Sequence, residues 1–415
     1  MVIIHIVDDL HTPVPRLLTA VLADHFRVMP AVVITGARQT GKSTIAERLS
    51  PGPRIYRSLD SLDVAELADR DPMALVGGSA PMTIDEVQRA PSLLIAIKRA
   101  IDLNRVAGRF LITGSANLLL MQRVSESLAG RASYLTLWPM TRGETDGRGD
   151  CGLWQELIQA GDHTWPDVVR ASTRTQTDWR MCARRGGFPT PALVLQSEAD
   201  RALWFDGYVR TYLERDLQAL SAIDALPDFR RLMRAVCLRV GQQLNQTDLG
   251  RDVALAQSTV HRYLNLMEAS YMLVRVPAYS VNRTKRLVKS PKLYWSDTAL
   301  AMHISGSHIT EGPHLENLVL GDLLAWRDTH ERRAEILYWR TSRGEEVDFV
   351  LEIGEQLVPI EVKATSRPSL RDAANIRLFR QEYGSAARTG LLLHTGEQIE
   401  WLAPDVLAVP WWRVM

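Results

Sequence analysis

Short apolar runs and stretches with helical spacing alternate along the first third of the chain. Runs rich in β-branched residues predict buried strands at 31–35, 81–84 and 109–113. Apolar residues at helical spacing predict helices over 13–28 and 44–49. Strands that alternate with helices in this way are typical of an α/β core with a parallel sheet.

The remainder of the chain shows two further patterns. A polar, loosely helical stretch over 141–180 precedes long helical periodicity over 197–240, and two short helices are then predicted near 246 and 257. Strands are predicted at 270–279 and 285–294. A helix that starts at Glu311 then precedes three strands, at 336–340, 346–351 and 357–363. We therefore expect a helical middle region and a second α/β region.

The strongest chemical motif directly follows the first predicted strand. It has the form GxxxxGKS and is followed by a helix, which is the context that a P-loop requires. Glycines allow the backbone N–H groups to wrap a polyphosphate, and the helix N-terminus adds positive potential. Lys42 would contact the β- and γ-phosphates, and the Ser43 hydroxyl would bind magnesium. The expected nucleotide-binding residues are Gly36, Ala37, Arg38, Gln39, Thr40, Gly41, Lys42, Ser43 and Thr44.

Two carboxylates end the next predicted strand. We expect Asp85 to hold the magnesium shell with Ser43, and Glu86 to polarise the attacking water. Two other features have two interpretations each. Ser115 and Asn117 follow the strand at 109–113 and would either sense the γ-phosphate or cap a helix. Arg131 would act as an arginine finger, in cis or across a subunit interface, or is a surface arginine.

These motifs occur in a recognisable order. ITGARQTGKST, TIDEVQRAP, FLITGSAN and SLAGR together resemble the AAA+-like ATPases of bacteria and archaea whose C-terminal region is a domain of unknown function. Gly186-Gly187-Phe188-Pro189 is similar to the GGxP motif that such proteins place beside the nucleotide. The segment from Trp204 to Asp216 is similar to their W…Y…RD helix. The resemblance spans nearly the whole chain and implies ATP binding.

The region around residues 245–294 has the order helix, turn, helix, hairpin. That order is typical of a winged helix-turn-helix. Its expected hairpin carries five basic residues that could follow a phosphate backbone: Arg283, Lys285, Arg286, Lys289 and Lys292. The rival interpretation is a winged helix that serves as a structural lid or protein-docking module.

Four residues near the C-terminus resemble the PD-(D/E)xK restriction-endonuclease fold. Alternation along the strand at 357–363 places Glu361 and Lys363 on one face. Asp348 and Glu361 would hold a divalent metal, with Glu316 completing its shell, and Lys363 would orient or deprotonate the water. The alternative is a fold kept for binding or packing without cleavage.

Composition narrows the class of protein only slightly. Of the 415 residues, 46% are hydrophobic and 23% are charged, a core-forming composition typical of soluble proteins. The net charge of +1 means that any basic surface must be local. The cysteines Cys151, Cys182 and Cys237 have neither disulfide nor zinc spacing, which fits a reducing cytoplasm. Neither a membrane helix nor a signal peptide is predicted.

The sequence thus predicts an α/β protein of four parts. These are an AAA+-like P-loop core (1–145), a helical linker or lid (146–225), a winged helix-turn-helix (226–300) and a nuclease-like domain (301–415). The expected function is a magnesium-dependent ATPase coupled to DNA or RNA, with a second divalent metal in the C-terminal part. A homo-oligomer is a candidate assembly. The alternative is a nucleotide-gated binding or regulatory protein with a catalytically silent C-terminal domain.

Overall fold

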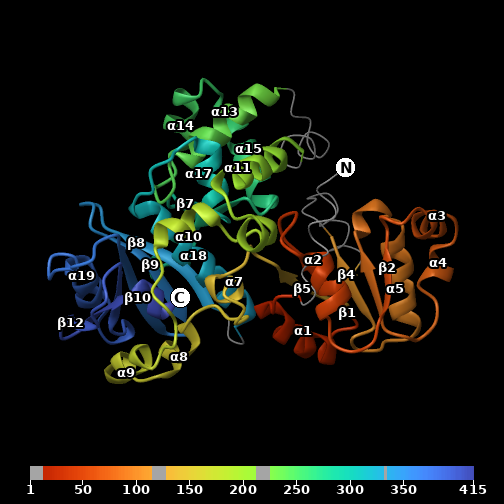
Figure 1. Cartoon of the computed structure of the whole chain (residues 1–415), viewed down its shortest axis with the longest axis horizontal. Coiled ribbons are helices and arrows are strands. Elements are labelled where there is room, and N and C mark those ends of the chain that lie inside the picture. The colour runs from red at the N-terminus through yellow and green to blue at the C-terminus, as the bar shows by residue number, and fades with distance from the viewer. Residues whose placement is uncertain (1–12, 115–127, 212–224, 331–333) are drawn as a thin grey trace.

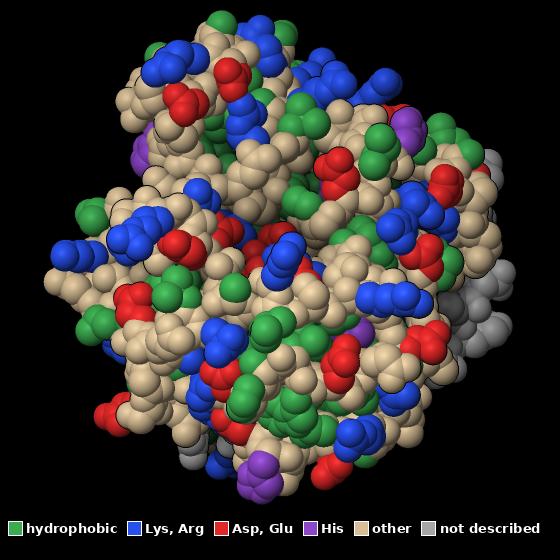
Figure 2. Space-filling model, turned by 90° about the vertical axis from the view of Figure 1, so that its left-hand side faces the viewer, with side chains coloured by type: hydrophobic (Ala, Val, Ile, Leu, Met, Phe, Trp, Pro, Cys, Tyr) green, Lys and Arg blue, Asp and Glu red, His purple; other side chains and the backbone are tan. Residues whose placement is uncertain are grey.

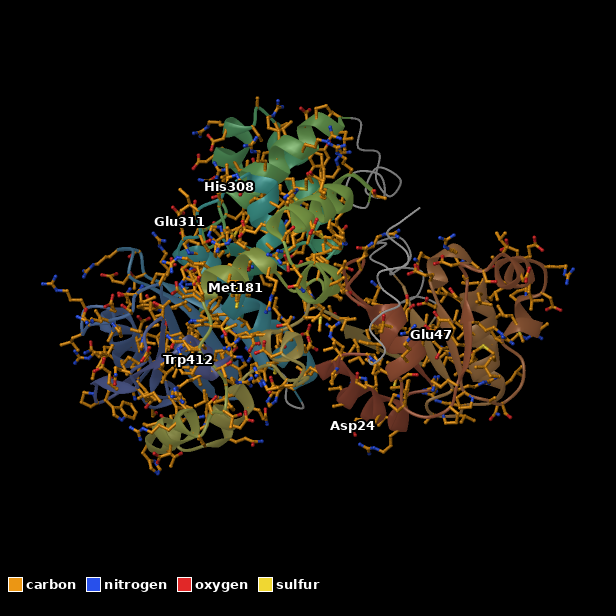
Figure 3. All side chains as sticks on the ribbon, in the orientation of Figure 1. Asp24, Glu47, Met181, His308, Glu311 and Trp412 are labelled. Atoms are coloured by element: carbon orange, nitrogen blue, oxygen red, sulfur yellow. The ribbon has the colours of Figure 1, made fainter. Side chains whose placement is uncertain are left out.

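The computed structural model describes residues 13–114, 128–211, 225–330 and 334–415. Three lobes are visible in Figure 1: the P-loop lobe at the right, a helical lobe at the top and the C-terminal lobe at the left. Asp24 and Glu47 mark the first of these in Figure 3, and Trp412 marks the last. Among the described residues, no helix combines the length and the apolar character needed to cross a bilayer.

The P-loop lobe is built on a parallel five-stranded sheet with the order β2-β3-β4-β1-β5. Successive side chains of β1 point to opposite faces, so Val33 packs with helix α5 while Val32 and Ile34 pack with helix α1. This confirms the α/β class predicted for the N-terminal region. The strands are β1 (Ala31–Thr35), β2 (Ile55–Ser58), β3 (Met82–Asp85), β4 (Phe110–Thr113) and β5 (Ala132–Thr136). The helices include α1 (Leu17–Val28), α2 (Lys42–Thr44), α3 (Leu62–Arg70), α4 (Pro72–Leu75) and α5 (Leu93–Leu103).

The segment expected as a linker or lid divides between two lobes. Helices α8 (Trp154–Gln159) and α9 (Trp165–Arg170) lie against the C-terminal lobe. Arg388 ties them there, because its guanidinium donates to the Ile158 carbonyl at 2.7 Å and to Asp162 at 2.8 Å. Helices α10 (Trp179–Arg185) and α11 (Glu198–Tyr208) instead join the helical lobe.

The helical lobe has the expected order of helices and strands, but its hairpin differs from the prediction. Strands β6 (Leu273–Val276) and β7 (Lys292–Trp295) pair antiparallel, and helix α16 (Arg283–Val288) lies between them in sequence. Both strands are therefore shorter than the expected 270–279 and 285–294. The helices are α13 (Leu226–Cys237), α14 (Gln246–Asp252), α15 (Gln257–Ala269) and α17 (Thr298–Ser305).

The C-terminal lobe contains a mixed six-stranded sheet with the order β12-β13-β11-β10-β9-β8. Helix α18 (Gly312–Thr329) packs on one face of it and α19 (Ala374–Tyr383) on the other. The strands are β8 (Ala334–Arg340), β9 (Glu346–Ile353), β10 (Gln356–Lys363), β11 (Gly390–His394), β12 (Glu400–Ala403) and β13 (Val406–Pro410), and the short helix α20 (Trp411–Val414) follows. One buried hydrophobic cluster continues from this lobe into the helical lobe, so the two share a core.

Candidate nucleotide site and C-terminal acidic site

The P-loop joins β1 to α2 at the carboxyl edge of the parallel sheet. Gly36 has a φ of +136°, and a Cβ there would lie 2.3 Å from the Leu137 carbonyl oxygen, so only glycine fits. Lys42 is buried, and its ammonium donates to the carbonyl oxygens of Gly36 at 3.2 Å and Ala37 at 2.7 Å. Burial lowers the pKa of Lys42 to about 8, against the opposing charge of Glu86.

Asp85 stands at the end of β3, where three side chains donate to it. The Ser43 hydroxyl donates at 3.1 Å, the Tyr56 hydroxyl at 2.9 Å, and the Thr113 hydroxyl also donates. The sequence prediction paired Ser43 with Asp85, and the structure brings them together. A hydroxyl and a carboxylate side by side at a P-loop are oxygen ligands that suit magnesium.

Glu86 follows directly in a left-handed backbone conformation, with a φ of 60°. Its backbone N–H donates to the Thr113 hydroxyl at 3.2 Å, and the Gln88 side chain donates to its carboxylate. Burial and then the charge of Asp85 raise the pKa of Glu86. A non-glycine residue in this conformation is uncommon and stores strain, which is often found at functional sites.

Residues from other parts of the chain contact the P-loop and the strand that leads into it. The Arg16 guanidinium donates to the Thr40 carbonyl at 2.6 Å, and its Nε lies 3.0 Å from the Glu144 carboxylate. The Tyr271 hydroxyl donates to the Thr35 hydroxyl at 2.9 Å. Residues of the helical lobe thus contact the strand that leads into the phosphate-binding loop.

The glycine-rich motif at 186–189 lies next to the same loop. A Cβ on Gly41 would lie 3.8 Å from the Pro189 ring. The Gly187 N–H donates to the Asp297 carboxylate at 2.6 Å, while burial raises the pKa of Asp297 to about 6. The motif therefore connects the P-loop lobe to α17 of the helical lobe. Arg215 and Asp216, at the end of the W…Y…RD segment, lie outside the described residues.

Arg131 does not reach the P-loop within one chain. It immediately precedes β5, and its carbonyl accepts from the N–H of Ala31, the first residue of β1. The P-loop follows the other end of β1, a strand about 16 Å long. The Arg131 guanidinium instead pairs with Asp102 at 2.6 Å. The two candidate phosphate sensors, Ser115 and Asn117, lie outside the described residues.

The C-terminal acidic site lies between α18, β9, β10 and β7. The Lys363 ammonium pairs with Glu361, as the alternation along β10 predicted. Burial and the charge of Asp348 raise the pKa of Glu361, and the same two causes raise the pKa of Glu316 to about 7. The four residues of the expected nuclease set are thus neighbours. They do not form a metal cage, because the described residues contain no group of three or more metal-ligating side chains positioned to hold an ion.

A fifth residue, Lys292, stands among these acids. Its ammonium lies 2.8 Å from Glu346, 3.2 Å from Asp348 and 3.4 Å from Glu316. The Tyr294 hydroxyl donates to Glu316 at 3.0 Å. Burial acts to lower the pKa of Lys292, but the surrounding acidic groups, first Tyr294 and then Asp348 and Glu316, raise it well above its usual range.

The prediction that all five basic residues of a hairpin could contact a phosphate backbone is therefore wrong in part. Lys292 is 1% exposed, and Arg286 is buried against Glu335 and Glu352 of the C-terminal sheet. Carboxylates of the C-terminal lobe pair with both cations, so their charges are neutralised within the protein. The basic residues of this region that remain at the surface are Arg283, Lys285 and Lys289.

Sequence reasoning missed several residues of both sites. Thr113 and Tyr56 contact Asp85, Arg16 contacts the P-loop, and Lys292 and Tyr294 enter the acidic site. Thr113 has a signal in the sequence, a hydroxyl at the end of a strand next to the one that carries Asp85. The others come from positions far away in the chain and have no local pattern.

The parallel sheet, the P-loop and the acid at the end of the neighbouring strand define the class of this protein as a P-loop ATPase of the AAA type. Residues 29–145 match an "AAA domain" model, 176–310 match "Domain of unknown function (DUF8612)", and 311–414 match "Domain of unknown function (DUF4143)". These matches support the ATP-binding AAA core.

The chain is 31% identical over 392 residues to uncharacterized proteins of Mycobacterium tuberculosis and Mycobacterium bovis, covering 92% of this chain and 80% of each relative. The chain belongs to the family of these proteins. In this chain the AAA domain precedes the two domains of unknown function. An uncharacterized protein of Haemophilus influenzae is 20% identical, over 86% of this chain and 88% of that protein. The Walker-type ATPase of Pyrococcus abyssi is similar with a TM-score of 0.41 and 14% identity, over 69% of this chain and 94% of that one.

Proposed function

We propose that this protein hydrolyses ATP with magnesium at the P-loop edge of its N-terminal sheet and acts as a nucleotide-dependent switch. The observation that carries the proposal is the position of Asp85, which accepts from Ser43 and Thr113 and is followed directly by Glu86. The proposal is supported further by the raised pKa of Glu86, the candidate base, and by the electrostatic interaction of Glu86 and Asp85 with Lys42.

Each residue has a distinct role in the proposed reaction. The P-loop amides and Lys42 bind the phosphates, and Ser43 and Asp85 would hold magnesium, which neutralises phosphate charge when it is bound. Glu86 accepts a proton from the attacking water. A water-oxygen bond to the γ-phosphorus then forms while the bond from that phosphorus to the β–γ bridging oxygen breaks. Burial favours this role, because a carboxylate of raised pKa is a better base near neutral pH.

The test compares three variants of the full chain. Lys42→Ala should lose ATP binding, whereas Glu86→Gln should bind ATP but hydrolyse it roughly 10²-fold more slowly, because it lacks the base. Glu47→Gln is the matched control, since this half-exposed acid also lies in the P-loop lobe. A Glu86→Gln rate equal to that of the control would show that Glu86 does not act on the water.

The switch would be transmitted through the residues that touch the P-loop. Tyr271 and Pro189 belong to the helical lobe and lie against Thr35 and Gly41. Because a bound phosphate is held by the backbone between these positions, its presence would favour one arrangement of the lobe. Limited proteolysis of Glu86→Gln with ATP and with ADP would detect this, and identical digestion patterns would count against a switch.

Nucleic acid remains a candidate partner for the helical lobe. The outward face of α15 is polar, with Gln257, Ser258, His261 and Asn265 exposed, and Lys285 and Lys289 lie at the surface of the same lobe. We propose contact with DNA or RNA there, through a winged helix-turn-helix. Lys285→Ala with Lys289→Ala should weaken binding of labelled duplex and reduce its salt dependence. Equal binding by the double variant would leave the lobe as a protein-docking module.

For the C-terminal lobe, the presence of Lys292 favours a catalytically silent domain over the nuclease suggested by Glu316, Asp348, Glu361 and Lys363. The expected result is that labelled DNA and RNA stay intact in magnesium or manganese, with or without ATP. Cleavage that disappears in Asp348→Ala and Lys363→Ala would instead establish the nuclease.

A further inference from the structure

The C-terminal acidic site is filled by a cation that belongs to the protein itself. Three carboxylate oxygens, from Glu346, Asp348 and Glu316, lie within 3.4 Å of the Lys292 nitrogen. An ammonium group has three N–H donors, so these acceptors match its full capacity. With a side chain that is 1% exposed, Lys292 has little access to water as an alternative partner.

Hydrogen bonds to neighbouring segments fix the position of β7, the strand that carries Lys292. It pairs with β6, and its residue Leu293 accepts from the N–H of Gly241 at 2.7 Å. A Cβ on Gly241 would lie 3.1 Å from Glu316, so this backbone lies closely over the carboxylate. The Lys292 side chain is therefore enclosed by these elements and is only 1% exposed, which favours the position of its ammonium beside the acids.

The same acids are of the chemical type that binds divalent metals. Magnesium and manganese prefer carboxylate oxygens at about 2.0–2.2 Å, and the neighbouring Glu361 adds a further buried carboxylate. One oxygen of Glu361 has no hydrogen-bond partner although it is buried, so the site retains acceptor capacity that Lys292 does not use. A metal within reach of both Asp348 and Glu316 would overlap the position of the ammonium group.

We propose that Lys292 is the resident cation of this site, that it excludes divalent metal from Glu316, Asp348 and Glu361, and that the site becomes a divalent-metal site when Lys292 is replaced by a neutral residue. Glu316 and Asp348 then lack the counter-charge of Lys292, and the mutual repulsion among the acids is relieved by a bound metal. Figure 2 shows a hollow below the helical lobe in which acidic side chains gather, on the face that the C-terminal lobe presents.

The experiment measures manganese binding to the full chain by electron paramagnetic resonance, without nucleotide. Lys292→Met keeps most of the apolar stem and removes the charge. Lys292→Met should bind one manganese ion at least about tenfold more tightly than the wild type does, and adding Asp348→Asn should abolish that binding. Lys285→Met is the matched control, because it removes a surface lysine of the same hairpin region and should leave manganese binding as in the wild type.

A second measurement separates metal binding from loss of fold. In EDTA, Lys292→Met should melt at a lower temperature than the wild type, and manganese should raise that melting temperature in Lys292→Met but not in Lys292→Met with Asp348→Asn. Folded Lys292→Met that binds no manganese would overturn the proposal. Should the Lys292 variants not fold, manganese binding by the wild type and by Asp348→Asn is compared directly. If the wild type binds manganese and Asp348→Asn does not, the proposal is overturned. Equal binding by the two proteins supports the proposal. ATP hydrolysis is not measured in any arm, so the outcome is independent of the proposed ATPase.

Discussion

The buried pair of Arg16 and Glu144 offers a test of how the P-loop is supported. The guanidinium bridges the Thr40 carbonyl, the Trp138 carbonyl at 2.8 Å and the Glu144 carboxylate. The side chains of Arg16 and Glu144 are 6% and 3% exposed. Glu144 also accepts from the N–H groups of Leu17 at 2.7 Å and of Thr141 at 2.9 Å. The pair thus joins the start of α1, the P-loop and the segment after β5.

Replacing Arg16 by Met should be costly for two reasons. Removing one partner of a buried ion pair leaves an uncompensated charge, which typically destabilises a protein by about 3–5 kcal/mol. The Thr40 carbonyl also loses its donor. Because Thr40 belongs to the P-loop, we expect ATP affinity to fall roughly tenfold, which corresponds to the free energy of about one hydrogen bond. Glu144→Gln keeps an acceptor oxygen and should cost less, about 1–3 kcal/mol.

A double-mutant cycle isolates the interaction. Urea unfolding of Arg16→Met, Glu144→Gln and the double variant should give a coupling free energy of about 2 kcal/mol. Binding of a fluorescent ATP analogue to the same proteins measures the effect on the P-loop. Arg27→Ala is the control, because Arg27 lies on the same helix in an ion pair with Asp24 that is about three-quarters exposed, and its loss should stay within about 0.5 kcal/mol. A coupling energy near zero, or unchanged affinity in Arg16→Met, would refute this reasoning.

Three further predictions concern other residues. Because burial lowers the pKa of Lys42 to about 8, the free protein loses this charge above that pH, and ATP affinity should fall by up to about tenfold per pH unit between pH 8 and 9.5 in a binding titration. Arg131→Ala should keep the wild-type ATPase rate, since its partner is Asp102, and mixing it with Lys42→Ala should restore nothing; restored activity would reveal a finger acting across subunits. Burial raises the pKa of Asp322 to about 7, so stability from its proton is present below about pH 4 and is lost as the pH rises through 7. Asp322→Asn keeps an acceptor for the Trp154 N–H. Its effect on the free energy of unfolding should be more stabilising above pH 7 than at acid pH, by up to about 4 kcal/mol. Equal effects of Asp322→Asn at pH 5 and pH 8 in urea titrations would contradict this.

The amino-acid sequence by itself determined the features that depend on neighbouring residues. The apolar run at 31–35 and the glycines around Lys42 specify a strand, a loop and a helix in immediate succession, and the structure confirms this order of elements. The strands that carry Asp348 and Glu361 were also predicted close to their observed bounds, because a short run of apolar residues is a local property of the sequence. Carboxyl ends of parallel strands meet at one sheet edge, which is why Ser43 and Asp85 could be paired across 42 residues.

Only the tertiary structure decided how charged residues find their partners. Lys292 looked like one cation of a basic hairpin, yet it meets Asp348, 56 residues away, inside another domain. Arg131 follows a motif that suggested a finger, yet the register of β5 against β1 places it at the sheet edge opposite the P-loop. Sequence spacing constrains a side chain only over a turn of helix or a few residues of strand. A charge can be paired with any opposite charge that the packing brings near, and packing is set by the apolar faces of whole elements.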